Sequence, residues 1–68
     1  MNLRERVVYK AARDIWDRTR QPVSANAIRE VTGFEDETTQ RVLNDLYLKG
    51  FFADALRGDD RIDSIVFS

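Results

Sequence analysis

Apolar residues recur every three or four positions along the first third of the chain. They are Leu3, Val7, Val8, Ala11, Ala12, Ile15 and Trp16. This spacing gathers them on one face of a helix. The opposite face carries Arg6, Lys10 and Arg13. Asn2 and Glu5 are spaced as in a capping box at the start of such a helix. The pattern therefore predicts an amphipathic helix over residues 3–19.

A break at Gln21-Pro22 separates this helix from a second, shorter one. Proline lacks a backbone donor and disfavours a helical conformation in the residue before it. Ser24 has the chemistry of an N-cap, and Gly33 that of a residue that ends a helix. We therefore expect a helix over residues 25–31. Its inward face is expected to be formed by Ala27, Ile28 and Val31.

A third helix is predicted after Phe34. Either Glu35 or Asp36 is suited to cap it, and Glu37 complements the positive end of the helix dipole. Gly50 is expected to end this helix. The side chains expected to face the core are Val42, Leu43 and Leu46, with Thr39 one turn before them. Tyr47 and Leu48 widen the apolar surface beyond one stripe, which leaves room for an additional contact.

The spacing of the apolar residues along the chain changes after Gly50. Residues 51–57 and 61–67 flank the turn-like tripeptide Gly58-Asp59-Asp60. The second segment is rich in β-branched and aromatic residues, namely Ile62, Ile65, Val66 and Phe67. A β-hairpin is therefore predicted, with the two segments paired antiparallel. Its first strand has the weaker signal, because residues 53–56 have low β propensity.

The length of 68 residues is that of one domain, residues 1–68. A chain this short has a small core, so self-association is one source of additional stability. The chain has no His and no Cys. Ser24, Ser64 and Ser68 therefore lack a His base for a catalytic triad, and the acidic segment GDDRIDS does not match a calcium-binding loop. We expect no enzymatic activity, no cofactor and no metal.

Three features indicate a cytoplasmic protein without a membrane anchor. The absence of cysteine fits a reducing compartment. The apolar run at residues 65–67 is far too short to span a bilayer. Arg4, Glu5 and Arg6 interrupt the apolar stretch that a signal peptide would need at the N-terminus.

Charge is distributed unevenly along the chain, although the net charge is only −1. Residues 1–20 carry six basic and three acidic side chains, whereas residues 21–34 are balanced. Residues 35–50 and residues 51–68 each carry two basic and four acidic side chains. The chain thus has a basic front and an acidic back. It lacks the uniform basic surface that is typical of nucleic-acid-binding domains.

The segment VTGFEDETTQRVLNDLYLKGFF, residues 31–52, is the part of the chain most similar to a known family. It resembles the winged helix-turn-helix superfamily: a helix that ends in Gly, a short turn, a helix with Thr and then Leu-x-x-Leu, a second Gly and an apolar pair. The order of three helices and a hairpin extends the resemblance over nearly the whole chain. It implies an α+β, mostly α fold in which the hairpin is the wing. At least one of Phe51 and Phe52 should then pack under the helices.

The resemblance also implies a DNA-binding function, since the third helix of many members enters the major groove of duplex DNA. The positions that match DNA-contacting positions of the family are Ser24, Asn26, Thr38, Gln40, Arg41, Asn44, Arg57 and Arg61. Arg is suited to guanine, and Gln or Asn to adenine. Ser24 and Asn26 would lie at a helix N-terminus, which favours a phosphate. By analogy, the small size fits a compact transcriptional regulator of a phage or mobile element.

Two features favour the alternative that these residues are simply polar surface and do not contact DNA. Glu35, Asp36 and Glu37 lie at the start of the third helix, where they would repel phosphates. The wing contains four Asp but only two Arg. In a winged helix that binds protein instead, the acidic wing or the surface at Tyr47 and Leu48 would contact the partner. The partner hypotheses are therefore double-stranded DNA, a second copy in a homodimer, and another protein.

Overall fold

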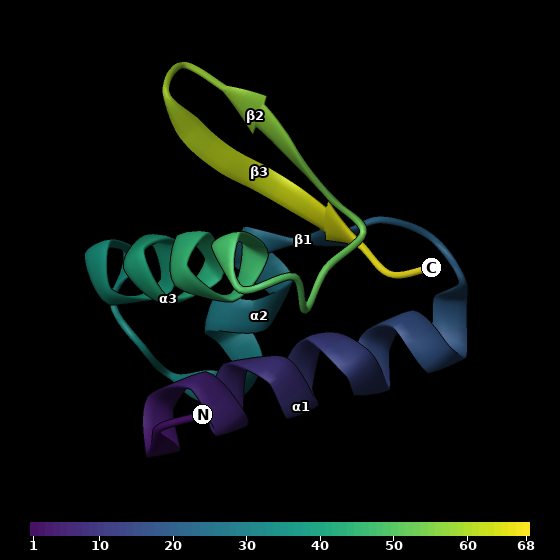
Figure 1. Cartoon of the computed structure of the whole chain (residues 1–68). Coiled ribbons are helices and arrows are strands. Elements are labelled where there is room, and N and C mark those ends of the chain that lie inside the picture. Colours follow the sequence, from purple (N-terminus) through teal and green to yellow (C-terminus); the bar gives the residue numbers. More distant parts are fainter.

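The computed structural model describes residues 1–68. Along the chain it contains α1 (Leu3–Thr19), β1 (Val23–Ser24), α2 (Ala25–Thr32), α3 (Asp36–Leu48), β2 (Asp54–Gly58) and β3 (Arg61–Val66). The three helices pack against one another, and β2 and β3 extend from them as a hairpin (Figure 1). This is the winged-helix-like, mostly helical α+β arrangement that the sequence pattern predicts.

α1 and α2 begin at side-chain caps, whereas α3 does not. The capping box at α1 is complete, because Asn2 Oδ1 accepts from the Glu5 N–H at 2.8 Å and Glu5 Oε1 accepts from the Asn2 N–H at 2.9 Å. Ser24 Oγ accepts from the Ala27 N–H at 3.0 Å at the start of α2. Glu35 takes the N-cap position of α3, but its side chain forms no capping hydrogen bond.

Two glycines with positive φ end α2 and α3. Gly33 has φ 77° and its N–H donates to the Arg29 carbonyl, as in an αL helix end. Gly50 has φ 86°; its N–H donates to the Tyr47 carbonyl, and the Phe51 N–H donates to the Leu46 carbonyl. This pair of bonds is a Schellman motif. It turns the chain out of α3 and toward the hairpin.

The sheet has three strands in the order β1-β3-β2, whereas the sequence pattern predicts only the hairpin. The additional strand β1 pairs with β3 antiparallel, through Val23 opposite Ile65 and Ser24 opposite Ser64. Two residues are too few to show a periodicity of their own. β1 forms because Val23 is buried against the core and β3 offers it an unpaired edge.

The hairpin is shorter than predicted at its first strand. β2 begins at Asp54, and Phe51–Ala53 form the connection from α3. Phe52 is buried and Phe51 is partly exposed, which confirms that one of the two packs under the helices. The loop consists of Asp59 and Asp60 alone, both with positive φ, as in a type I′ turn.

The core lies where the three helices meet the sheet. Its members are Val8, Ala12, Val23, Ala25, Ile28, Val42, Leu43, Leu46, Phe52, Ile62, Ile65 and Phe67. The α3 residues predicted to face inward, including Thr39, are all buried. The prediction is wrong for Leu3, Val7 and Val31, which are exposed. The buried residues of α1 are Glu5, Val8, Ala11 and Ala12, so the line at residues 3 and 7 lies outside the core.

Candidate nucleic-acid interface

Three polar contacts hold the hairpin against α3. On the helix they start from Asp36, Gln40 and Asn44, which are spaced four residues apart and therefore form one stripe along α3. On the hairpin they end at β2 and β3. The stripe makes α3 and the hairpin one connected surface.

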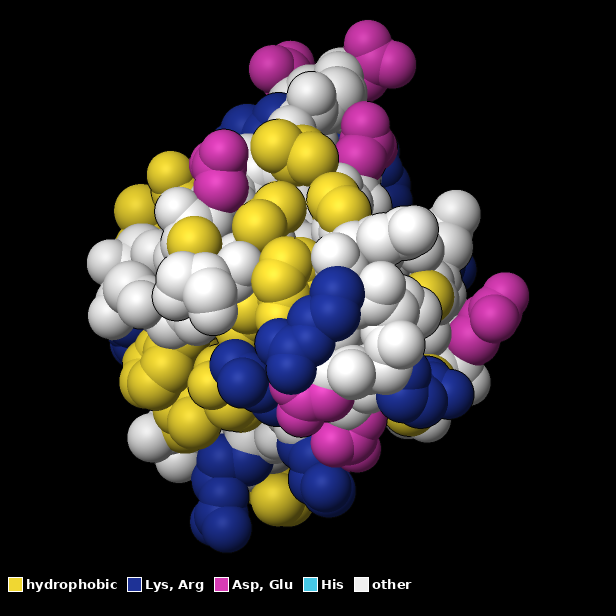
Figure 2. Space-filling view, turned by 90° about the vertical axis from the view of Figure 1, so that its right-hand side faces the viewer, with side chains coloured by type: hydrophobic (Ala, Val, Ile, Leu, Met, Phe, Trp, Pro, Cys, Tyr) yellow, Lys and Arg dark blue, Asp and Glu magenta, His cyan; other side chains and the backbone are white.

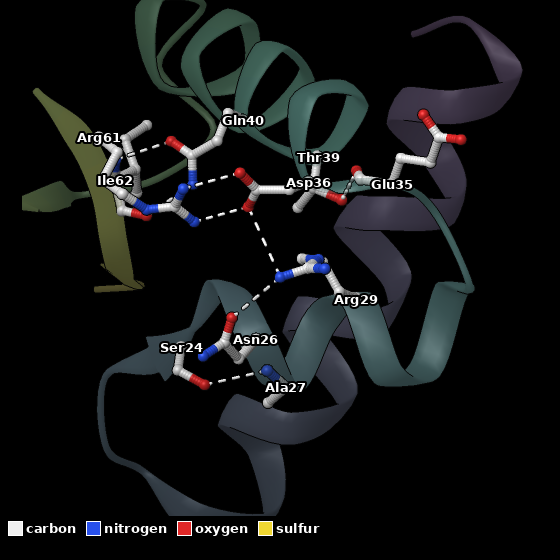
Figure 3. A network of polar contacts seen from close by, with 10 residues as sticks. All are labelled: Ser24, Asn26, Ala27, Arg29, Glu35, Asp36, Thr39, Gln40, Arg61 and Ile62. Atoms are coloured by element: carbon white, nitrogen blue, oxygen red, sulfur yellow. Dashed lines mark hydrogen bonds and ion pairs between the residues drawn. The ribbon is translucent and has the colours of Figure 1, made fainter.

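The first contact is a bidentate ion pair between Asp36 and Arg61 (Figure 3). Arg61 Nη1 and Nη2 donate to the two carboxylate oxygens of Asp36 at 2.7 and 2.6 Å. Arg29 of α2 lies on the same carboxylate at 3.6 Å and also donates to Asn26 Oδ1 at 3.2 Å. Asp36 thus connects α2, α3 and β3.

The second contact joins Gln40 to the backbone of Ile62 (Figure 3). Gln40 Nε2 donates to the Ile62 carbonyl at 2.8 Å, and the Ile62 N–H donates to Gln40 Oε1 at 2.7 Å. Ile62 is only 1% exposed, so these backbone groups have little access to water. The amide of Gln40 therefore replaces a missing strand neighbour for β3 at this position.

The third contact joins Asn44 to Arg57 of β2, with Arg57 Nη2 donating to Asn44 Oδ1 at 2.9 Å. Both side chains are near solvent, unlike the Gln40 pair. The Asn44 amide nitrogen and the rest of the Arg57 guanidinium therefore remain accessible. Of the three contacts, this pair has the side chains best suited to contact a base or a phosphate.

The eight predicted DNA-binding residues thus occupy different environments. Gln40, Asn44, Arg57 and Arg61 lie along the junction of α3 and the hairpin, and Asn26 joins them through Arg29. Ser24 caps α2. Arg41 projects from the outer face of α3, 69% exposed, and pairs with Glu37 at 3.3 Å. Thr38 is half-buried on the same helix. The DNA contacts of all eight remain a prediction.

Charge is distributed unevenly over the surface. On the face drawn in Figure 2, acidic side chains surround the hairpin end at the top, and most Lys and Arg lie in the lower half, toward α1. A band of hydrophobic side chains runs down the same face from the hairpin. Leu48 on α3, Phe51 in the connection to β2 and Leu56 on β2 are exposed.

Sequence reasoning missed Asp36, Arg29 and the ion pair between Glu5 and Lys49. It treated Asp36 only as a cap candidate and a phosphate-repelling charge. Glu5 is 2% exposed, and its Oε2 accepts from Lys49 Nζ at 2.7 Å. The two residues are 44 positions apart. The capping box accounts for Glu5 locally, and nothing local predicts its second partner.

The ion pairs of Glu5 with Lys49 and of Asp36 with Arg61 shift the pKa of both carboxyl groups. The hydrogen bond from Lys49, and then that from the Asn2 N–H, lower the pKa of Glu5. The hydrogen bonds from Arg61 lower the pKa of Asp36. Folding lowers both values, so the unfolded chain binds more protons in acid. Their stabilisation is present above the ordinary carboxyl pKa and is lost as the pH falls through the lowered values.

We therefore expect the thermal midpoint to fall as the pH is lowered from about 6 to about 3. Glu5→Gln should make this decline shallower and should lower the midpoint at neutral pH, because Lys49 loses its charged partner. The measurement is circular dichroism melting across the pH range. Glu30→Gln, on the exposed face of α2, is the matched control. An equally steep decline in Glu5→Gln and wild type would contradict the assignment to Glu5.

No group of three or more His, Cys, Asp or Glu side chains is placed to hold a metal ion. None of the helices has the length and apolarity needed to cross a membrane. Comparisons with protein-family models, with curated proteins and with solved structures each yield no match. Membership of the winged helix-turn-helix superfamily therefore stays a prediction from the residue pattern.

Proposed function

We propose that this protein binds double-stranded DNA through α3 and the hairpin, as a small transcriptional regulator. The observation that carries the proposal is the attachment of the hairpin to α3 by the Asp36, Gln40 and Asn44 contacts. A helix and a wing that contact one duplex must keep a set distance from each other. These contacts supply that constraint before any DNA arrives, which lowers the entropic cost of binding.

Within this surface we assign base contact to Arg41 and Asn44, with Thr38 beside them. The Arg41–Glu37 pair is highly exposed on both sides, at 69% and 84%. An exposed i,i+4 pair is worth only about 0.3–0.5 kcal/mol, so Arg41 can exchange Glu37 for a base at little cost. Arg57 is suited to contact phosphate, and Ser24 and Asn26 at the start of α2 likewise.

Gln40 and Arg61 contribute indirectly in this proposal. Gln40 Nε2 already donates to Ile62, and Arg61 Nη1 and Nη2 already donate to Asp36. They position the hairpin against α3, and these bonds hold their side chains in place. The acidic hairpin limits affinity, because phosphate neutralisation dominates DNA binding. Regulation of genomic DNA would place the protein in the cytoplasm, and its size fits a compact phage-type regulator.

The test is a titration against a selected and a random duplex at two salt concentrations. Arg41→Ala should weaken binding to the selected duplex by about 1–3 kcal/mol and reduce the preference for it. Arg57→Ala should weaken binding to both duplexes alike, because phosphate contacts carry no sequence information. Glu37→Gln should strengthen binding to both, since it removes a charge that repels phosphate.

Arg4→Ala is the matched control, since it removes the same charge from the exposed first turn of α1. It should change binding less than Arg41→Ala does. Absence of salt-dependent binding to any duplex at low ionic strength would rule out the DNA-binding proposal.

A second candidate function, protein binding, is favoured by the apolar groups beside the acidic hairpin. Leu48 is 73% exposed, and Phe51 and Leu56 are also exposed. Exposed apolar side chains on segments that carry net negative charge suit a protein partner with a basic rim. Leu48→Asp would then abolish capture of that partner, whereas it would weaken DNA binding only modestly.

A further inference from the structure

We propose that the outer face of α1 is the interface of a homodimer in which the two α1 helices pack antiparallel. The proposal concerns the side of the molecule opposite the hairpin and does not rest on the proposed function. In Figure 1, α1 lies below α3 and the hairpin stands above it. A dimer through α1 therefore leaves α3 and the hairpin accessible in both copies.

An apolar groove runs along this face. Three adjoining hollows follow α1 from its first turn to its last. The first and second hollows share Val7 and Lys10 in their linings. The second and third share Ala11, Asp14 and Val31. Leu3 is 74% exposed and Val31 is 61% exposed beside it. Met1 and Val7 are exposed as well, so four of the seven exposed large hydrophobic side chains lie on this one face. Such a cluster indicates an interaction surface.

The charges along the groove favour a second copy of the chain as its occupant. Arg6 and Lys10 line the end near the N-terminus, whereas Asp14 and Asp17 line the other end. Arg18 is also at that end, where its Nε donates to the Asp14 carbonyl. An antiparallel second copy places the basic end of each groove on the acidic end of the other. The same pairing of a basic end with an acidic end thus occurs at both ends of the interface, as two-fold symmetry requires.

Helix geometry fixes which residues face each other in this pairing. If the two-fold axis passes level with Ala11, which is itself buried, Val7 of one copy lies opposite Ile15 of the other. Lys10 is then offset from Asp14 of the second copy by two residues, or about 3 Å at 1.5 Å per residue. A lysine side chain spans that offset easily. Lys10 already lies 3.4 Å from Asp14 of its own chain, so the dimer creates an alternating ring of four charges.

The first test is the mass of the protein in solution. Sedimentation equilibrium should show a concentration-dependent rise from 7.9 kDa toward twice that mass. Leu3→Glu and Val31→Glu should abolish the rise while the circular dichroism spectrum stays unchanged, because both side chains are already exposed. Leu48→Glu is the matched control, since Leu48 is equally exposed but lies on α3. It should dimerise like the wild type.

The second test examines the antiparallel arrangement. Lys10→Glu and Asp14→Lys should each be monomeric, since each places like charges against the second copy. An equimolar mixture of the two variants should recover association. In the mixed dimer, the carboxylate introduced at position 10 of one variant faces the ammonium introduced at position 14 of the other. High salt should weaken the recovered dimer.

Three results would overturn the proposal. The wild type could remain at 7.9 kDa at the highest attainable concentration. Leu48→Glu could abolish association while Leu3→Glu does not, which would place the interface elsewhere. The mixture of charge variants could stay monomeric, which would exclude the antiparallel arrangement. DNA binding is measured in none of these experiments, so their outcome is independent of the proposed function.

Discussion

Leu46→Ala is expected to destabilise the protein by about 2–5 kcal/mol, which approaches the whole stability of a domain this small. Leu46 is fully buried on α3 and belongs to the core between α1, α3 and the sheet. Its carbonyl also accepts the bond that completes the Schellman motif, so the residue lies where the chain leaves the helix. The truncation removes the branched end of the side chain and leaves a cavity that the backbone can only partly close.

The measurement is chemical denaturation followed by circular dichroism, with thermal melting as a second observable. Leu48→Ala is the matched control, because it makes the same change two residues further along the same helix at a side chain that is 73% exposed. It should alter stability by no more than about 0.5 kcal/mol. Equal effects of the two substitutions would show that the register of α3 differs from the one described.

Gln40→Leu is expected to have the second-largest effect on stability. The substitution keeps most of the side-chain volume but removes both hydrogen bonds to Ile62. The Ile62 N–H and carbonyl would then be left without partners at a residue that is 1% exposed. Leaving a buried polar group unsatisfied costs about 1–3 kcal/mol, and here two groups are affected. The hairpin should also become more mobile relative to α3.

Denaturation curves and the amide exchange of Ile62 provide the two measurements. Gln21→Leu, at an exposed position outside every helix and strand, is the control and should leave both nearly unchanged. Gln40→Glu offers a further check, because a carboxylate can still accept from the Ile62 N–H but repels the Ile62 carbonyl. Its effect should therefore decrease when the carboxyl is protonated. Unchanged exchange at Ile62 in Gln40→Leu would contradict the positioning role.

The helices were predictable because their signals are local. α1 spans the predicted residues 3–19, and α2 exceeds the prediction by only one residue. Asn2, Ser24, Gly33 and Gly50 act at the ends of helices through their own backbone and nearest turns. Such contacts connect residues three to five positions apart, so the sequence already contains both partners.

The faces of the helices were less predictable than their ends. Apolar spacing predicted a broad inward face for α1, but Leu3 and Val7 are exposed and the polar Glu5 is buried. Which stripe of a helix is covered depends on the lengths and crossing positions of its neighbours. α2 has only eight residues and cannot cover the whole apolar side of α1. β1 was missed for a related reason, since its pairing with β3 depends on chain segments about 40 positions apart.

The sequence by itself determined the order of the elements, the ends of the helices, the buried residues of α3 and the hairpin. It also determined which side chains have the chemistry to contact DNA. The tertiary structure decided which of those side chains are free: Arg41 projects into solvent, whereas Gln40 and Arg61 bind Ile62 and Asp36. The reason is physical. Propensities and caps act within one turn, whereas the partner of a polar side chain depends on which distant segment the packed core brings beside it.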